Sequence, residues 1–177
     1  MEMESNQSVR VMDVPNSYAS DELFSTSPMC QEDIPALARL EEECFSEPWS
    51  EQSLAVELDN DTAHFFVAKS SDGTVVGYAG MHDVFGEGYI ANIAVSAPWR
   101  GRGVGRLLVG SLVGYAQEKK LDFLTLEVRA SNEAAISLYR TEGFELVGKR
   151  KDFYRNPQED ALLMTRRFLV RESESEI

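Results

Sequence analysis

Cysteine and histidine are scarce in this chain of 177 residues, which contains only Cys30, Cys44, His64 and His82. These four residues show none of the short spacings that metal-binding cysteine and histidine motifs share. We therefore expect no metal site and no disulfide. We interpret both cysteines as reduced, small residues of the core.

Long apolar runs are missing from the amino terminus. Residues 1–20 are rich in Ser, Asn, Asp and Glu, contain one basic residue, Arg10, and include no apolar stretch long enough for a signal peptide or a membrane span. We expect a cytoplasmic protein without a membrane partner. Its length and composition predict one domain, at 21–170, between a disordered extension at 1–20 and a charged tail at 171–177.

Positive charge is scarce in the first third of the chain. The net charge is −13, and residues 1–60 contain 14 acidic but only two basic side chains. Binding to a nucleic-acid backbone depends on Lys and Arg, so we expect no nucleic-acid partner. Six of the acidic residues either face a cationic substrate or, as we prefer, form a solvated helix face. They are Glu41, Glu42, Glu43, Glu47, Glu51 and Glu57.

The most informative segment present is Arg-Gly-Arg-Gly-Val-Gly at 100–105, between a strand-like segment at 89–95 and a helix-like one at 104–119. Glycine permits positive φ and lets backbone N–H groups approach a ligand, and the following helix adds unpaired N–H groups and the positive end of its dipole. Arg100, Arg102 and Arg106 add charge at the same place. The segment predicts a phosphate-binding turn, and a glycine-rich turn without a ligand is the alternative.

Two common kinds of phosphate site fit this segment poorly. A Walker-type loop ends in Gly-Lys-Ser/Thr, but Gly105 is followed by Arg106-Leu107, which supply neither the lysine for the phosphates nor the hydroxyl for magnesium. In a dinucleotide fingerprint counted from Gly101 and Gly103, the third glycine position is occupied by Arg106. An ATPase and a dinucleotide-binding enzyme are therefore disfavoured.

Hydrophobic periodicity, caps and turn residues predict seven strands and four helices. The strands are expected at 23–29, 64–69, 74–82, 89–95, 123–128, 144–153 and 161–168, and the helices at 34–44, after Ser50, at 104–119 and at 132–140. The order β-α-α-β-β-β-α-β-α-β-β predicts an α/β (α+β) domain. Its central sheet should be mixed and mostly antiparallel, with six to seven strands and about four flanking helices.

The ordered motifs of the chain resemble the GNAT superfamily of acetyl-CoA-dependent N-acetyltransferases. The superfamily signature R-x-x-G-x-G is met by Arg100, Gly103 and Gly105, directly after a strand that reads Asn-Ile-Ala-Val at 92–95. More specifically, residues 22–169 resemble the ribosomal-protein-alanine N-acetyltransferases of the RimI type. The segments that carry this likeness are Pro48-Trp49-Ser50, Leu126-Glu127-Val128-Arg129-Ala130-Ser131-Asn132, Ala134-Ala135-Ile136, Leu138-Tyr139, Gly143-Phe144 and Glu159-Asp160-Ala161.

The resemblance implies an enzyme in which Glu127 accepts a proton from the amine and Tyr139 donates one to the coenzyme A sulfur. These roles suit the chemistry, because acetyl transfer needs a neutral amine and a protonated leaving group. The alternatives are a solvated carboxylate for Glu127, a core tyrosine for Tyr139 and a helix cap for Asn132. The implied acetyl-CoA contacts are Ile93, Ala94 and Val95 for the pantetheine arm, Arg100, Gly101, Arg102, Gly103, Val104, Gly105 and Arg106 around the pyrophosphate, and Asn132.

The acceptor that the RimI-type resemblance implies is the amino-terminal alanine of a small-subunit ribosomal protein, in a groove lined by Trp49 and Tyr154. At pH 7 an α-amine costs about 1 kcal/mol to deprotonate and a lysine about 4–5 kcal/mol, so an α-amine is slightly favoured. We expect Glu127 to be partly desolvated or to act through a water. For Trp49 the alternative is a hydrophobic plug between the first two helices. At Phe153-Tyr154 the chain departs from the two tyrosines common in the family.

Two other functions stay open. One is a superfamily enzyme that acetylates a small amine or a lysine side chain. The other is a non-catalytic acyl-CoA-binding module, which would not need both Glu127 and Tyr139. The sequence predicts no oligomeric state.

Overall fold

The predicted order of strands and helices is confirmed by a computed structural model that describes residues 23–168. The predicted extension and tail, at 1–20 and 171–177, lie outside the described residues. The helices are α1 (Ile34–Cys44), α2 (Glu51–Leu58), α3 (Val104–Glu118) and α4 (Glu133–Thr141), and the strands are β1 (Phe24–Pro28), β2 (Ala63–Ser70), β3 (Val75–Val84), β4 (Glu87–Val95), β5 (Phe123–Arg129), β6 (Glu145–Arg155) and β7 (Gln158–Arg167). Short 3-10 turns, η1 (Gln31–Asp33) and η2 (Ala97–Trp99), precede α1 and follow β4.

Local sequence signals set the helix boundaries. The Ser50 hydroxyl accepts a hydrogen bond from the Ser53 N–H at 3.1 Å and caps α2. The Asn132 side chain accepts from the Ala135 N–H at 3.2 Å and caps α4 in the same way. Gly143, with φ +82°, follows the end of α4. A left-handed residue there is accessible to glycine without the strain that a side chain would add.

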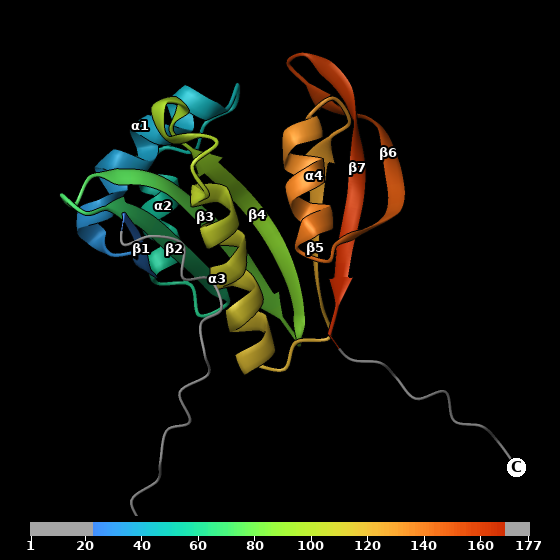
Figure 1. Ribbon diagram of the computed structural model, residues 1–177, viewed down its shortest axis with the longest axis horizontal. Helices are drawn as coiled ribbons and strands as arrows, with labels where there is room; N and C mark the ends of the chain where they lie inside the picture. The colour runs from blue at the N-terminus through green and yellow to red at the C-terminus, as the bar shows by residue number, and fades with distance from the viewer. Residues whose placement is uncertain (1–22, 169–177) are drawn as a thin grey trace, which may run out of the picture.

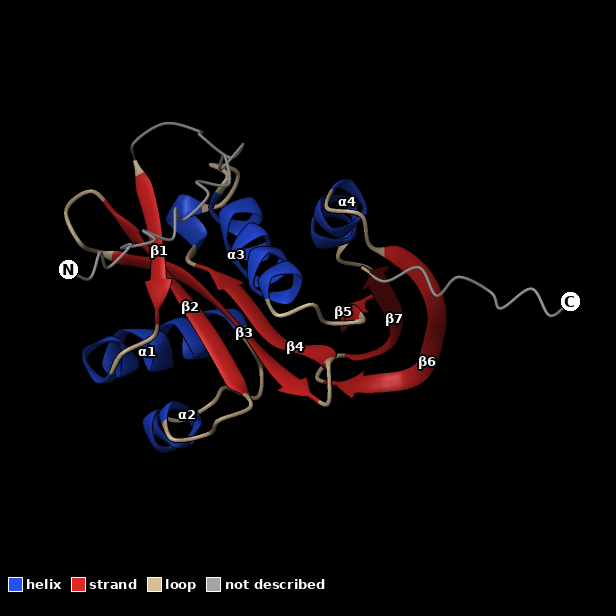
Figure 2. Cartoon of the chain, turned by 90° about the horizontal axis from the view of Figure 1, so that it is seen from below, coloured by secondary structure: helices blue, strands red, loops and turns tan. Residues whose placement is uncertain are grey.

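All seven strands form one sheet in the order β1-β2-β3-β4-β5-β7-β6. Every neighbouring pair is antiparallel except β4 and β5, which α3 connects and which run parallel. Figure 2 shows α1 and α2 against one face of the sheet and α3 and α4 against the other. Within residues 23–168, no helix covers the α1/α2 face of the β5-β7-β6 part.

The core is divided by the sheet into two clusters. The larger cluster lies under α3 and α4 and includes Leu108 and Leu112, both without exposed surface. The smaller one lies under α1 and α2 and includes Leu37 and Leu54, also without exposed surface. Burial of such a side chain contributes about 1.5–3 kcal/mol to stability.

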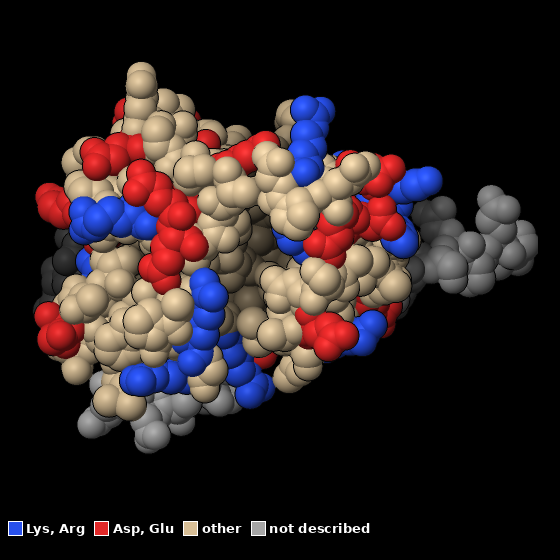
Figure 3. All heavy atoms as spheres, turned by 90° about the horizontal axis from the view of Figure 1, so that it is seen from above, with Lys and Arg blue, Asp and Glu red and all other residues tan. Residues whose placement is uncertain are grey.

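The sheet is split between β4 and β5. These strands pair only over their first three residues, from Glu87 with Phe123 to Tyr89 with Thr125. Figure 1 shows β4 and β5 diverging toward their carboxyl ends. Figure 3, which looks at the molecule from that end, shows a hollow between the two halves with Lys and Arg side chains at its rim. The fold thus leaves strand edges without a partner strand where the glycine-rich turn begins.

Two predictions about single residues are wrong. Cys30, expected in the core, is exposed, because it lies in the turn before η1. Glu41, expected on a solvated face of α1, has no exposed surface. It follows Leu37 by four residues and therefore lies on the same, buried side of the helix.

A transmembrane helix is also absent from the described part of the chain: no helix in residues 23–168 is long and apolar enough to span a bilayer.

Candidate active site

The glycine-rich segment forms the turn between β4 and α3. Gly101 and Gly103 have φ values of +71° and +88°, which L side chains rarely adopt, and a Cβ on either would meet no atom within 4 Å. Gly103 is the N-cap residue of α3, and no side chain of the described chain caps this helix. Within residues 23–168 no side chain satisfies the first N–H groups of α3, which fits the predicted phosphate-binding role.

Two arginines of the turn contact neighbouring protein groups. Arg100 donates from Nε to the Val95 carbonyl at 2.9 Å and from Nη2 to the Cys44 sulfur at 3.4 Å. The Arg102 guanidinium lies 5.1 Å from the centroid of the Trp99 ring. Both side chains are also exposed to solvent. They can therefore add positive charge near the turn in addition to making these contacts.

The third arginine, Arg106, joins α3 to α4. Its Nε lies 2.9 Å from Oε1 of Glu142, whose side chain is only 3% exposed. This carboxylate partly offsets the charge of Arg106, so Arg106 adds less to the attraction for an anion than an unpaired arginine would.

The free edge of β4 lies beside the split. A register shift against β3 leaves Ala91 as an extra residue in β4, and beyond Tyr89 the edge that faces β5 has no strand partner. Backbone groups of residues 93–95 on that edge lie along the predicted path of the pantetheine arm. The Val95 carbonyl differs from the others, because it already accepts a hydrogen bond from Arg100.

Glu127 lies on the face of β5 that no described helix covers. Its neighbours Leu126 and Val128 are buried in the cluster with α3 and α4, so the alternation of the strand directs Glu127 to the opposite face. Its side chain is 28% exposed, and its Oε1 lies 3.4 Å from Nη1 of Arg150. Glu127 lines a cavity of about 320 Å³ with Tyr89, Phe123, Thr125, Val147, Arg150, Leu163, Thr165 and Arg167.

Tyr139 is buried on the α4 side of β5, in the cluster that contains Leu126 and Val128. Its ring lies 5.9 Å from that of Phe144, and within residues 23–168 its hydroxyl makes no hydrogen bond. Burial raises the pKa of Tyr139 well above its ordinary value, which makes the hydroxyl a weaker acid than that of an exposed tyrosine. The hydroxyl is protonated at neutral pH, as a proton donor must be.

The predicted groove residue Tyr154 lies on β6. Burial raises its pKa, and the charge of Glu127 raises it further; Tyr154 in turn adds to the raised pKa of Tyr139. The Arg129 guanidinium stacks over the Tyr154 ring at 4.2 Å from its centroid.

Two other predicted site residues have structural roles here. Asn132 caps α4, as the alternative interpretation anticipates, and its ligand role stays a prediction. The Trp49 ring packs against Phe65, with ring centroids 6.0 Å apart, and the backbone N–H of Trp49 donates to Glu41 at 2.9 Å. These contacts match the hydrophobic plug, and the groove-lining role of Trp49 also stays a prediction.

Two arginines near the predicted base were not predicted as site residues. Arg129 lies within the Leu-Glu-Val-Arg motif but received no role, and only its place in that motif could have drawn attention to it. Arg150 carries no signal in the sequence, because its pairing with Glu127 depends on the register of β6 against β7.

The family model described as "Acetyltransferase (GNAT) family" matches residues 34–144, which include the glycine-rich turn, Glu127 and Tyr139. The chain belongs to the GNAT family. The resemblance found in the motifs is thereby confirmed.

Two relatives and one crystal structure are similar to most of this chain. The chain is 39% identical over 134 residues to a Bacillus subtilis protein assigned as a [ribosomal protein bS18]-alanine N-acetyltransferase, covering 75% of this chain and 88% of that protein. It is 34% identical over 154 residues to the Mycobacterium tuberculosis N-alpha-acetyltransferase RimI, covering 84% and 95%. The crystal structure of the Escherichia coli ribosomal-protein-S18-alanine N-acetyltransferase superposes with a TM-score of 0.77 at 29% identity, covering 88% of this chain and all of that one.

As a GNAT acetyltransferase, the protein is an enzyme that takes its acetyl group from acetyl-CoA. The chain offers what this cofactor needs. The open turn at Gly101 and Gly103 fits a pyrophosphate, and the unpaired edge of β4 fits an extended arm with amide groups.

Proposed function

We propose that the protein acetylates the amino-terminal α-amine of a protein, and that its acceptor is the N-terminal alanine of ribosomal protein bS18. The relatives named for this reaction align with most of this chain and most of their own length. The observation that carries the proposal is the split between β4 and β5, with Glu127 on one face of β5 and Tyr139 on the other. An amine that arrives on the open face and a thioester bound on the α3/α4 face would meet at the split, between Glu127 and Tyr139.

Acetyl-CoA supplies the acetyl group as a thioester when it is bound. Glu127, directly or through a water, accepts the proton that the amine loses as its nitrogen bonds to the carbonyl carbon. Tyr139 donates its proton to the sulfur as the carbon–sulfur bond breaks. Transfer of this proton avoids the release of a free thiolate, which is a costly leaving group in a low-dielectric site, and Tyr139 regains a proton from solvent after the products leave.

Arg150 has a role in orienting the base. Its guanidinium lies 3.4 Å from the Glu127 carboxylate and 5.5 Å from the centroid of the Phe153 ring. A carboxylate held by one cation, with part of its surface open to the cavity, keeps a fixed direction and can still accept a proton.

The choice of an α-amine follows from proton energetics. An α-amine near pKa 7.7–8.0 costs about 1 kcal/mol to deprotonate at pH 7, and a lysine near 10.4 costs about 4–5 kcal/mol. Glu127 is still 28% exposed, so it is not the deeply desolvated base that a lysine acceptor would favour.

Mass spectrometry of purified protein with acetyl-CoA and peptides tests the proposal. The peptides are the N-terminal sequence of bS18, the same peptide with a blocked amino terminus, and a polyamine as a small-amine control. We expect acetylation of the free α-amine only. Modification of the blocked peptide or the polyamine instead would keep the acetyltransferase and discard this acceptor, and binding of acetyl-CoA without any transfer would favour a non-catalytic module.

A further inference from the structure

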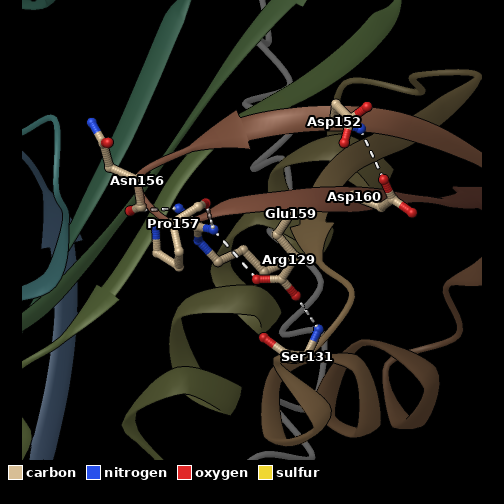
Figure 4. A network of polar contacts seen from close by, with 7 residues as sticks. All are labelled: Arg129, Ser131, Asp152, Asn156, Pro157, Glu159 and Asp160. Atoms are coloured by element: carbon tan, nitrogen blue, oxygen red, sulfur yellow. Dashed lines mark hydrogen bonds and ion pairs between the residues drawn. The ribbon is translucent and has the colours of Figure 1, made fainter.

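Arg129 ties the turn between β6 and β7 to the end of β5. Its Nη1 donates to the Pro157 carbonyl at 2.9 Å, and its Nη2 donates to the Asn156 carbonyl at 3.1 Å. Figure 4 shows the guanidinium reaching from β5 to these two adjacent carbonyls. A planar guanidinium can satisfy two such acceptors at once, which a lysine ammonium cannot do with the same geometry.

Glu159 completes this connection from the β7 side. One carboxylate oxygen lies 3.3 Å from Nη1 of Arg129, and the other accepts from the Ser131 N–H at 2.5 Å (Figure 4). The hydrogen bond from Ser131 lowers the pKa of Glu159, and Arg129 lowers it further, so the carboxylate is ionised at neutral pH. The Ala130 N–H also donates to the Asp160 carbonyl at 3.1 Å. The hairpin is therefore fastened to the β5–α4 turn at several points.

The same guanidinium also supports the ring of Tyr154. Arg129 lies 4.2 Å from the ring centroid of Tyr154, which is half-buried, and the charge of Glu127 contributes to the raised pKa of the Tyr154 hydroxyl. No hydrogen bond fixes the Tyr154 hydroxyl within residues 23–168, so the position of the ring depends on its packing against the Arg129 guanidinium and against the Phe153 ring, whose centroid lies 5.1 Å away. The Arg129 side chain thus contacts both the turn between β6 and β7 and the ring of Tyr154.

We propose that Arg129 is a positioning residue for the acceptor peptide. It preassembles the wall formed by Tyr154 and the β6–β7 turn, so the peptide does not have to order that hairpin when it binds. Preorganisation of this kind lowers the entropic cost of binding. The inference rests on the proposed function, because it assumes that the acceptor approaches on the Glu127 face. It assigns Arg129 no role toward acetyl-CoA, whose predicted cradle lies across the split at Gly101 and Gly103.

Steady-state kinetics of Arg129 variants test this role, because only the KM for the peptide, and not the KM for acetyl-CoA, should change. The variant Arg129→Met keeps a long apolar side chain and loses the guanidinium. We expect its KM for the alanine peptide to rise at least tenfold while its KM for acetyl-CoA stays within twofold. Arg129→Lys should restore only part of the peptide affinity. Lys149→Met is the matched control, because it removes another ion pair of this hairpin, to Asp160 at 2.7 Å, without touching the turn or Tyr154.

Hydrogen exchange measured by mass spectrometry gives a readout that needs no acceptor. In Arg129→Met we expect faster exchange in residues 152–159 and unchanged exchange in α3. Unchanged exchange in that segment, or a peptide KM equal to that of the wild type, overturns the proposal. If Arg129→Met does not fold, the same measurements on Arg129→Lys decide.

The two proposals can fail separately. A wild-type enzyme that leaves the alanine peptide unmodified overturns the proposed acceptor, and the role of Arg129 in binding it falls as well. The exchange experiment then still shows whether the hairpin is held as described. An active wild type with an insensitive Arg129→Met variant overturns the positioning role alone.

Discussion

Glu127 and Tyr139 lie on opposite faces of β5, at the edge of the split that separates it from β4. Under the proposed mechanism, each substrate has its own side of the sheet. The acceptor would approach on the open face, where Glu127 borders a cavity, and acetyl-CoA on the face of α3 and α4, where the glycine-rich turn leads into α3.

Tyr139→Phe should lower kcat by about 10²-fold or more, because it removes the proton donor to the sulfur. The affinity for acetyl-CoA and the free energy of unfolding should change little, since the hydroxyl makes no hydrogen bond within residues 23–168. Steady-state kinetics and isothermal titration calorimetry measure the two effects. Tyr115→Phe is the control: it removes a hydroxyl that lies 2.6 Å from His64 Nε2, in the cavity at the β1–β2 end of the sheet. Full turnover in Tyr139→Phe would remove the proton-donor role.

Glu127→Gln should lower kcat/KM for the alanine peptide by about 10²–10⁴-fold, the usual range for loss of a general base. Glutamine keeps the shape of the side chain, so binding of acetyl-CoA should be preserved. The exposed Glu133 in the first turn of α4 supplies the matched control, Glu133→Gln, which should keep full activity. Equal activity of the two variants would contradict the assignment of the base.

Local signals in the sequence were enough to predict the elements, because each one is visible within a few residues. Ser50 and Asn132 cap the helices that follow them, and Gly143 ends α4 as expected. The strands around the Asn156-Pro157 turn extend to within one residue of it, farther than alternation alone indicates.

Contacts between distant segments were not predictable in this way. The split depends on where the pairing of β4 with β5 stops, and no sequence signal in either strand predicts that point. The burial of Glu41 depends on partners 37 and 51 residues away. Arg106, expected to face a phosphate, pairs with Glu142 because α4 packs beside α3.

Gly103→Ala should raise the KM for acetyl-CoA about tenfold. Its φ of +88° costs a residue with a side chain about 1–2 kcal/mol, and its Cβ would enter the open space beside the first N–H groups of α3. Kinetics and urea denaturation test the two consequences. Gly114→Ala is the control: it lies inside α3 with nothing within 4 Å of its Cβ, so it should raise stability by up to about 1 kcal/mol and leave this KM unchanged.

Glu41→Ala should lower the free energy of unfolding by at least about 3 kcal/mol. The Glu41 carboxylate accepts hydrogen bonds from the Tyr78 hydroxyl, from the Asn92 side-chain amide at 2.9 Å and from the backbone N–H of Trp49 at 2.9 Å. Truncation leaves these donors without their acceptor, at about 1–3 kcal/mol for each buried group. Urea denaturation at pH 7 measures the loss. The adjacent, exposed Glu42 gives the control Glu42→Ala, which should stay within about 0.5 kcal/mol of the wild type.

The ion pair between Asp33 and Lys69, 2.7 Å apart, should make stability depend on pH in the acid range. Burial alone would raise the pKa of Asp33, but hydrogen bonds from Lys69 and Cys30 outweigh it and the pKa is lowered. Because the folded-state pKa lies below the unfolded value of about 3.9, the stabilisation is present above that value and is lost as pH falls through the folded-state pKa. The difference in unfolding free energy between the wild type and Asp33→Asn should therefore shrink between about pH 5 and pH 2. With the exposed Asp61→Asn as control, the difference should be small throughout, and a difference for Asp33→Asn that is constant with pH would show that the carboxylate charge contributes nothing.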